Sequence, residues 1–416
     1  MAAVVRVALA RCFEQQQMRS RPPRAIMGAV HLCPRPGSRL LHHAPLVALI
    51  LLSCVAPGGH SLQTFAAQQR PWLRNAPALS RSSHLAALAA NTAVTEGTSD
   101  AEYSERYGNK APALTLQAPS KINLFLRILR KREDGYHELA SLFQAVSLTD
   151  TLDFWVECAD SSKPICSMEV SPDSVGRAGI PTDETNLVMR ALKLFADKTG
   201  TKQRVHCRLH KNAPAQAGLG AGSSDAATAM HAANRLAGFP ATQQQLIEWS
   251  AELGSDISFF FSRGTAYCTG RGEIIENVPP LPDTPCFLVK PADGLSTPAV
   301  FKQLGLNKGQ ALDGPDPRKL LADFQVSVTG GTFLNDLEPP AFAVMPKLDK
   351  LRMDLKALGF DAVMMSGSGS TIFCIGRPAV AGAAWKEDIV QKHGASIFEV
   401  RFCQRSPNEQ LWYNEA

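Results

Sequence analysis

The chain has 416 residues, of which 45% are hydrophobic and 19% charged, enough for two or three domains with well-buried cores. Its formal net charge of +5 is unevenly spread, because residues 1–95 hold ten Arg, no Lys and one acid, Glu14, and contribute +9. Residues 96–416 carry a net charge of −4, so the basic charge of the whole chain does not indicate nucleic-acid binding by the body. Ten scattered Cys, with no Cys-x-x-Cys pair or metal-spaced cluster, favour a reducing compartment.

Residues 1–112 are predicted to be a targeting leader and a linker. The run LVALILLSCVA at residues 46–56 is too short to span a bilayer comfortably and is typical of a signal-peptide core, with Met27 as an alternative start. Residues 65–95 are rich in Ala, Ser and Arg and contain no acid, as in a transit peptide. This order resembles the bipartite leader of proteins that enter complex plastids. The alternative is a disordered extension or a misassigned start, and the cleavage sites stay open.

The first strand of the body is predicted over residues 114–129, with a kink at its Ala-Pro pair. In KINLFLRIL the period is two, so Lys121 and Asn123 share one face while apolar residues share the other. This polar face is either the wall of a site or the solvent face of an edge strand.

The rest of the body mixes helical and strand patterns, with PPLPDTP at residues 279–285 as the best interdomain break. We therefore predict an N-terminal domain over residues 113–281 and a C-terminal domain over residues 282–416. The expected elements are strands at 152–157, 205–210 and 286–290, helices at 186–198, 226–236, 243–253 and within 341–358, a hairpin around 264–272, and a strand–turn–strand unit over 360–375.

A glycine-rich stretch, KNAPAQAGLGAGSSDAA at residues 211–227, is the most informative motif. Its glycines would let the backbone approach a ligand, and Ser223, Ser224 and Asp225 are expected to cap the helix that follows. Such a turn presents unpaired N–H groups, which suits phosphate. It is neither a Walker loop nor a good dinucleotide fingerprint, and a plain packing turn is the alternative.

Two further features point to phosphoryl transfer. Asp256 follows a predicted helix and precedes an apolar run, and a second turn, SGSGS, occupies residues 366–370. Phosphoryl transfer needs a cradle for the donor, a proton acceptor for the hydroxyl and a cation such as Lys121. The alternatives are that Asp256 caps a short helix and that the second turn is an ordinary tight turn.

These motifs resemble those of the GHMP kinases, which include galactokinase and the homoserine, mevalonate and phosphomevalonate kinases. PAQAGLGAGSSDAA is similar to their ATP-binding motif and SGSGST to their C-terminal glycine-rich motif. APSKINLFLRILRKREDGYHELASLFQ is similar to the N-terminus of one branch, the 4-diphosphocytidyl-2-C-methyl-D-erythritol kinase family, and NLVMRA, LGSDISFFF, STPAVF and NDLE follow in the order found there. The resemblance covers residues 114–405.

The resemblance implies a two-domain α+β fold behind an unstructured leader. The N-terminal domain would be like domain 2 of ribosomal protein S5, and the C-terminal domain would be ferredoxin-like. The implied reaction is ATP-dependent phosphorylation of the 2-hydroxyl of 4-diphosphocytidyl-2-C-methyl-D-erythritol, in the non-mevalonate isoprenoid pathway of a plastid. A mevalonate or homoserine type of kinase is an alternative that the Tyr136-His137 pair disfavours. A non-catalytic nucleotide binder is another, which Lys121 and Asp256 together disfavour.

The resemblance also implies residue roles. Asp256 would accept the hydroxyl proton, and Lys121 would steer that carboxylate and stabilise the transferring phosphoryl group. In the acceptor pocket, Tyr136 and Phe301 would sandwich the cytosine, His137 would read its edge, Asn123 would bind the methylerythritol hydroxyls, Phe143 would wall the pocket and Thr297 would lie beside Phe301. The implied nucleotide contacts are Asn186, Lys211, Pro214, Gly218, Leu219, Gly220, Ala221, Gly222, Ser223, Ser224, Gly367 and Gly369.

The implied cofactors are ATP and Mg²⁺. A Ser223 or Ser224 hydroxyl could touch the metal, but no dedicated carboxylate ligand is evident. The implied partner is a small-molecule substrate, with no nucleic acid and, in the mature form, no membrane, and the oligomeric state is left open. Gln216 and Ala221 stand where the family often has glycine, and a side chain at 221 narrows the turn, which would alter nucleotide affinity.

Overall fold

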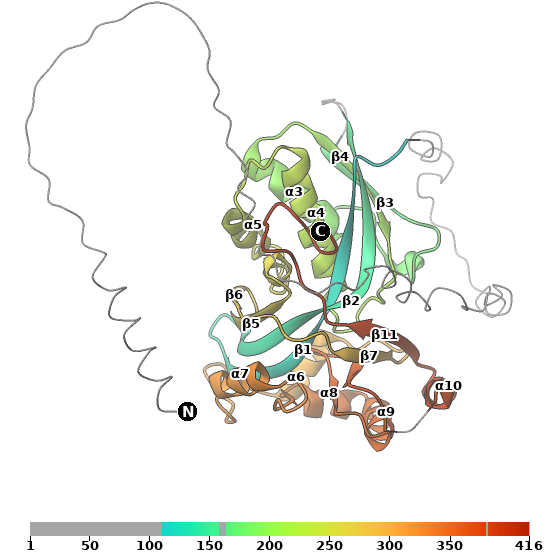
Figure 1. The fold of residues 1–416 in the computed structure, drawn as a ribbon. Coiled ribbons are helices and arrows are strands. Elements are labelled where there is room, and N and C mark those ends of the chain that lie inside the picture. The colour runs from blue at the N-terminus through green and yellow to red at the C-terminus, as the bar shows by residue number, and fades with distance from the viewer. Residues whose placement is uncertain (1–109, 158–163, 380–381, 416) are drawn as a thin grey trace, which may run out of the picture. The chain divides into compact units, whose positions relative to one another are not determined.

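The computed structural model describes residues 110–157, 164–379 and 382–415 (Figure 1). The predicted leader, with its signal-like and transit-like segments, lies outside the described residues. Within the described part of the chain, every helix is too short or too polar to cross a membrane.

The larger sheet is mixed and has the strand order β3-β4-β2-β1-β8, with β5 also pairing with β2 and β6 pairing with β5. Its strands are β1 (Leu114–Lys131), β2 (His137–Glu157), β3 (Cys166–Val170), β4 (Arg204–His210), β5 (Thr265–Gly270), β6 (Ile274–Asn277) and β8 (Leu334–Asn335). The helices of this half are α3 (Leu187–Thr199), α4 (Ala221–Leu236) and α5 (Gln243–Ser250), with short 3-10 helices η1 (Arg177–Gly179) and η2 (Ser258–Phe261).

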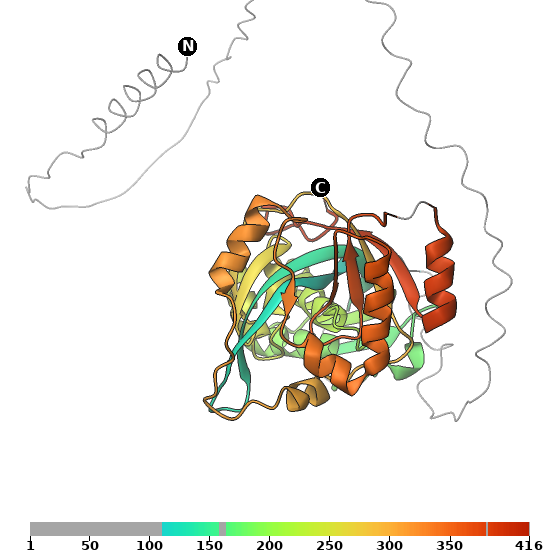
Figure 2. The same cartoon turned by 90° about the horizontal axis from the view of Figure 1, so that it is seen from below.

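The smaller sheet is antiparallel, with the order β11-β7-β10-β9. Its strands are β7 (Pro285–Lys290), β9 (Ala362–Met365), β10 (Ile372–Ile375) and β11 (Ser396–Arg401). Helices α8 to α10 lie toward the viewer in Figure 2, in orange and red. The helices of this half are α6 (Thr297–Leu304), α7 (Pro317–Val326), α8 (Glu338–Val344), α9 (Pro346–Ala357) and α10 (Ala384–His393).

Strand β1 carries the polar face predicted from its period-two pattern. It pairs with β2 along almost its whole length and with β8 at residues 125–126, and its register shifts at the predicted kink, between Pro119 and Ser120. Lys121 and Asn123 are 3% and 1% exposed, so the alternative of a solvent-facing edge strand is wrong. The intervening apolar residues pack toward the smaller sheet, in one core with Leu288.

The predicted helices and strands are confirmed, and so is the α+β class. The predicted boundary at residues 281/282 falls between β6 and β7, but β8 and the C-terminal residues cross it. Trp412 donates from its indole nitrogen to Thr228 Oγ1 on α4 at 3.0 Å, and it is buried in the core of the larger sheet. The division into two domains therefore stays a prediction.

One local prediction is wrong. Ser223, Ser224 and Asp225 do not cap the Ala-rich helix, because α4 begins earlier, at Ala221. Its N-cap is Gly220, in the left-handed conformation at φ 63°, and no side chain caps the helix end. Glycine adopts this conformation without steric cost, so the turn feeds directly into the helix.

Candidate active site

The two glycine-rich turns lie against each other, although they are far apart in the sequence. The Ser366 hydroxyl donates to the Gly218 carbonyl oxygen at 2.9 Å. A Cβ at Gly218 would collide with the Ser366 carbonyl oxygen, so only glycine allows this approach. Asn335 on β8 donates to the carbonyl oxygens of Met365 and Gly367 at 2.9 and 2.8 Å and holds the second turn in place.

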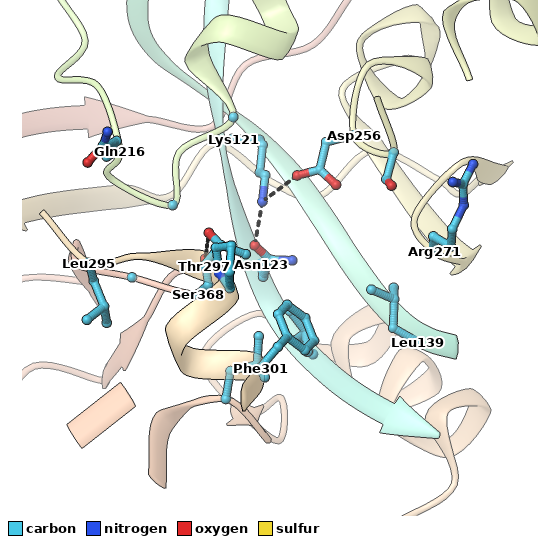
Figure 3. Close-up of a pocket in the computed structure, with 18 of the residues that line it drawn as sticks. Lys121, Asn123, Leu139, Gln216, Asp256, Arg271, Leu295, Thr297, Phe301 and Ser368 are labelled. Atoms are coloured by element: carbon cyan, nitrogen blue, oxygen red, sulfur yellow. Dashed lines mark hydrogen bonds and ion pairs between the residues drawn. The ribbon is translucent and has the colours of Figure 1, made fainter. Parts of the chain in front are cut away.

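Lys121 lies between the two turns and links them to Asp256 (Figure 3). Its backbone N–H donates to the Leu219 carbonyl oxygen at 2.8 Å, and its Nζ lies 3.3 Å from Asp256 Oδ2. The same Nζ donates to Asn123 Oδ1 at 2.8 Å and lies 4.6 Å from the centre of the Phe143 ring. The Lys121 side chain is 4% exposed, whereas that of Asp256 is 33% exposed, so the carboxylate opens onto the cavity.

A cavity of about 540 Å³ contains this pair. The Thr297 and Ser368 hydroxyls are hydrogen-bonded at 2.7 Å, which ties the start of α6 to the second glycine turn (Figure 3). The predicted site residues that line this cavity are Lys121, Asn123, Phe143, Gly218, Gly220, Asp256, Thr297, Phe301, Gly367 and Gly369.

A second cavity, of about 370 Å³, lies beyond the first glycine turn. It shares Gln216, Gly218 and Gly220 with the first cavity, so the turn separates two adjoining spaces. The predicted nucleotide contacts that line it are Asn186, Lys211, Pro214, Gly218, Leu219, Gly220, Ala221, Gly222 and Ser223. Ser224, by contrast, lines neither cavity and is fully buried.

The N-terminus of α4 faces this second cavity. The Ser224 N–H donates to the Gly220 carbonyl oxygen at 2.9 Å, so the helix itself does not use the N–H groups of Ala221, Gly222 and Ser223. These groups and the helix dipole favour a negatively charged ligand at this end. The chemistry of this wall therefore fits a phosphate group.

Lys211 lines the second cavity, but its ammonium group is already paired. It is hydrogen-bonded to Asp150 and, at 2.7 Å, to Asp225, and all three side chains are buried. Burial raises the pKa of Asp225 to about 7, with Lys211 opposing the shift and Asp150 adding to it. Asp150 also accepts the backbone N–H groups of Asn212 and Ala213 at 2.6 and 2.8 Å, so the cluster holds the strand end that leads into the glycine turn.

Tyr136 and His137 lie near the rim of the first cavity and do not line it. The His137 ring lies 4.7 Å from the Phe301 ring, and its buried Nε2 has no hydrogen-bond partner among the described residues. Burial holds the pKa of His137 below its usual value. Tyr136 is 56% exposed, and the Arg271 guanidinium lies 5.0 Å from the centre of its ring.

Several residues of the site are not predicted from the sequence. Arg271 lies within the predicted hairpin around residues 264–272, but no local pattern points to its place at the cavity. Ser368 lies inside the second glycine turn, and Asn335 belongs to NDLE, where nothing local indicates its contact with that turn. The remaining unpredicted cavity residues are Leu126, Leu139, Gln216, Ser255, Leu295, Ser296, Pro298 and Leu337.

Comparisons with known proteins agree with this geometry. Residues 186–264 match the GHMP kinases N terminal domain, and residues 310–392 match GHMP kinases C terminal. These matches, with two glycine turns around a Lys–Asp pair, define the class as a GHMP kinase and confirm the GHMP kinase fold of the body.

Relatives identify the branch. The 4-diphosphocytidyl-2-C-methyl-D-erythritol kinase, chloroplastic/chromoplastic, of Solanum lycopersicum is 44% identical over 308 residues, which cover 73% of each chain. The 4-diphosphocytidyl-2-C-methyl-D-erythritol kinase of Protochlamydia amoebophila is 42% identical over 306 residues, covering 74% of this chain and 95% of that one. A crystal structure of a 4-(cytidine 5′-diphospho)-2C-methyl-D-erythritol kinase has a TM-score of 0.55 and 30% identity, covering 70% of this chain and 99% of the other. The chain belongs to the 4-diphosphocytidyl-2-C-methyl-D-erythritol kinase family.

Proposed function

We propose that this protein transfers the γ-phosphoryl group of ATP to the 2-hydroxyl of 4-diphosphocytidyl-2-C-methyl-D-erythritol. The observation that carries the proposal is the Lys121–Asp256 pair, 3.3 Å apart, beside a glycine turn that separates two adjoining cavities. One cavity would hold ATP and the other the acceptor. The names of the relatives support the choice of acceptor over mevalonate or homoserine.

In this mechanism Asp256 accepts the proton of the attacking hydroxyl. An aspartate carboxylate is a weak base. It suffices here because the transition state of phosphoryl transfer is loose and the proton leaves late. Lys121 orients Asp256 and places positive charge beside the transferring group, while Asn123 anchors Lys121 and offers hydrogen bonds to the acceptor hydroxyls.

The ATP phosphates would bind the backbone N–H groups at the start of α4, with the nucleoside toward Asn186 and Pro214. Lys211 would act indirectly, because its charge is taken up by two carboxylates. Mg²⁺ would arrive with ATP and neutralise phosphate charge. Ser223 lines the nucleotide cavity, and its hydroxyl would help to hold the metal. The described residues contain no group of three or more Asp, Glu, His or Cys that could hold a metal ion.

The cytosine end of the acceptor would bind at the rim formed by Tyr136, His137 and Phe301. The unpartnered, buried Nε2 of His137 supports a hydrogen bond to the base edge. Stacking of a base on an aromatic ring contributes about 1–3 kcal/mol. Phe143 and Thr297 line the path from this rim to Asp256.

We also propose that the mature enzyme acts in a plastid, as the chloroplastic relatives of plants suggest. Residues 1–112 would serve as the bipartite leader, and the folded body would divide near residue 281. N-terminal sequencing of the protein purified from its source tests the leader. A mature N-terminus close to Met1 would contradict it.

The test of the function is ATP-dependent turnover of the cytidine-diphosphate acceptor, compared with mevalonate and homoserine under the same conditions. We expect turnover of the first substrate only. A folded, ATP-binding protein that phosphorylates mevalonate or homoserine instead would refute the proposal. Tyr136→Ala is the companion variant, and we expect it to raise the KM for the acceptor with little change in the KM for ATP.

A further inference from the structure

Arg271 is a cation that lines the acceptor cavity, and no sequence motif assigns it a role. It sits in the turn between β5 and β6, between Gly270 and Gly272, both of which have positive φ angles of 72° and 120°. A Cβ at Gly272 would lie 3.2 Å from Asp256 Oδ1, so this turn abuts the proposed proton acceptor. Figure 3 shows Arg271 on the hairpin beyond Asp256, on the side away from the glycine turns.

The Arg271 guanidinium is held on two sides. Its face lies on the Tyr136 ring, 5.0 Å from the ring centre, and its Nε lies 3.5 Å from Glu273 Oε1. Glu273 also accepts the Arg271 backbone N–H at 2.6 Å, which anchors the turn. Within the described residues, the two terminal guanidinium nitrogens have no hydrogen-bond partner, and the side chain is 29% exposed. The terminal nitrogens of the guanidinium are therefore held in place and available to a ligand.

Among the charged side chains of the described residues that line this cavity, Arg271 is the one available to pair with a diphosphate. Lys121 and Arg271 are the cations among the described residues that line the cavity, and Lys121 is engaged by Asp256 and Asn123. The proposed acceptor carries its diphosphate between the base and the methylerythritol. Arg271 occupies the corresponding place, because it touches Tyr136 on one side and its neighbour Gly272 abuts Asp256 on the other.

We propose that Arg271 binds the diphosphate of the acceptor through its terminal guanidinium nitrogens and so selects a nucleoside-diphosphate acceptor over an uncharged one. The inference rests on the proposed function for the identity of the acceptor. A planar guanidinium donates two parallel hydrogen bonds to phosphate oxygens, which an ammonium group does not. Stacking on Tyr136 reduces the entropy cost of ordering the Arg271 guanidinium when a ligand binds.

The experiment compares two ligands on three variants. Binding of cytidine 5′-diphosphate and of cytidine is measured by calorimetry with the ATP site saturated by a non-hydrolysable ATP analogue, so that only the acceptor cavity is free. For Arg271→Ala we expect cytidine 5′-diphosphate to bind about 10- to 100-fold more weakly, as for loss of a charge-assisted contact. Cytidine should change by less than about threefold, and Arg271→Lys should lie between Arg271→Ala and the wild type.

Arg318→Ala is the matched control. Arg318 also lies over a tyrosine ring, 4.3 Å from the centre of Tyr267, and pairs with Glu276 at 2.7 Å, but it does not line the cavity. We expect this variant to bind both ligands as the wild type does. Equal weakening of both ligands by Arg271→Ala would overturn the inference, because it would mean that Arg271 only supports Tyr136. Unchanged binding of cytidine 5′-diphosphate would overturn it as well.

Turnover separates this inference from the proposed function. If the wild type binds cytidine 5′-diphosphate through Arg271 but does not phosphorylate the proposed acceptor, the function fails and the inference about Arg271 stands. If the wild type turns over the acceptor and Arg271→Ala has an unchanged KM for it, the function stands and the inference fails.

Discussion

Lys121 and Lys211 are both almost completely buried beside the first glycine turn, yet their surroundings differ. They are 3% and 5% exposed. Lys121 faces a single carboxylate, that of Asp256, which is one-third exposed to the cavity. Lys211 faces Asp150 and Asp225, whose side chains are 0% and 4% exposed.

The difference shows that burial of a lysine near a phosphate site does not by itself make it a ligand. Two buried carboxylates take up the charge of Lys211, whereas Lys121 and its carboxylate reach the space where the reaction is proposed to occur. We therefore expect changes at the Lys121 pair to act mainly on turnover and changes at the Lys211 cluster to act mainly on stability.

Asp256→Asn should lower turnover more than any of the other substitutions. We expect kcat to fall by about 10²- to 10⁴-fold, because the amide cannot accept the hydroxyl proton. The KM for ATP and the unfolding midpoint should stay near those of the wild type, as steady-state kinetics and urea denaturation would show. Asp283→Asn, an exposed carboxylate paired with Arg401, serves as the control. Wild-type turnover by Asp256→Asn would remove this residue from the mechanism.

Lys211→Met should have the largest effect on stability. Removing the cation leaves two buried carboxylates unpaired, which costs about 3–5 kcal/mol of unfolding free energy. Lys121→Met should cost less stability and more turnover, because the carboxylate it leaves behind is partly hydrated. If Lys211→Met does not fold, Lys211→Met combined with Asp225→Asn should regain part of the stability. An equal loss of unfolding free energy in Lys211→Met and Lys121→Met would contradict the claim that the Lys211 cluster acts mainly on stability.

The Lys211 cluster should also make stability depend on pH. The pKa of Asp225 is about 7 in the folded protein and near 3.8 for an ordinary Asp, so the folded state binds more protons between these values. Its contribution to stability is therefore full below about pH 3.8 and is lost as pH rises toward about 7. Chemical denaturation at several pH values should show that the stability of the wild type relative to Asp225→Asn falls from about pH 4 to about pH 7. A difference that grows with pH would contradict this assignment.

Gln216→Gly should have the smallest effect, although Gln216 lines both cavities. Gln216 has a φ of 51°, a left-handed conformation that glycine adopts more easily, but glycine also gains freedom in the unfolded chain. We expect the unfolding free energy to change by less than about 1 kcal/mol and the Kd for ATP by less than about threefold. A larger change in the Kd, measured by calorimetry, would mean that the Gln216 side chain contacts the nucleotide.

Local sequence patterns were sufficient to predict most helices and strands. They were also sufficient to place Lys121 on a polar strand face, but not to pair it with Asp256. Alternation in KINLFLRIL placed Lys121 and Asn123 on one face, and the structure joins them by a 2.8 Å hydrogen bond. Alternation and helical spacing are local properties, so they survive whatever the chain packs against. The start of α4 was misplaced because the preference of Ser and Asp for N-caps was outweighed by the left-handed Gly220.

What the sequence by itself determined is the two glycine turns and, through resemblance, the α+β class and the kinase family. Only the tertiary structure decided which charged groups meet. Pairing of β1 with β2 and β8 set Lys121 between the two turns, and the β5–β6 turn set Gly272, the neighbour of Arg271, against Asp256. Packing likewise committed Lys211 to Asp150 and Asp225. The physical reason is that these contacts join segments far apart in the chain, and their charges interact strongly only after folding removes the intervening water.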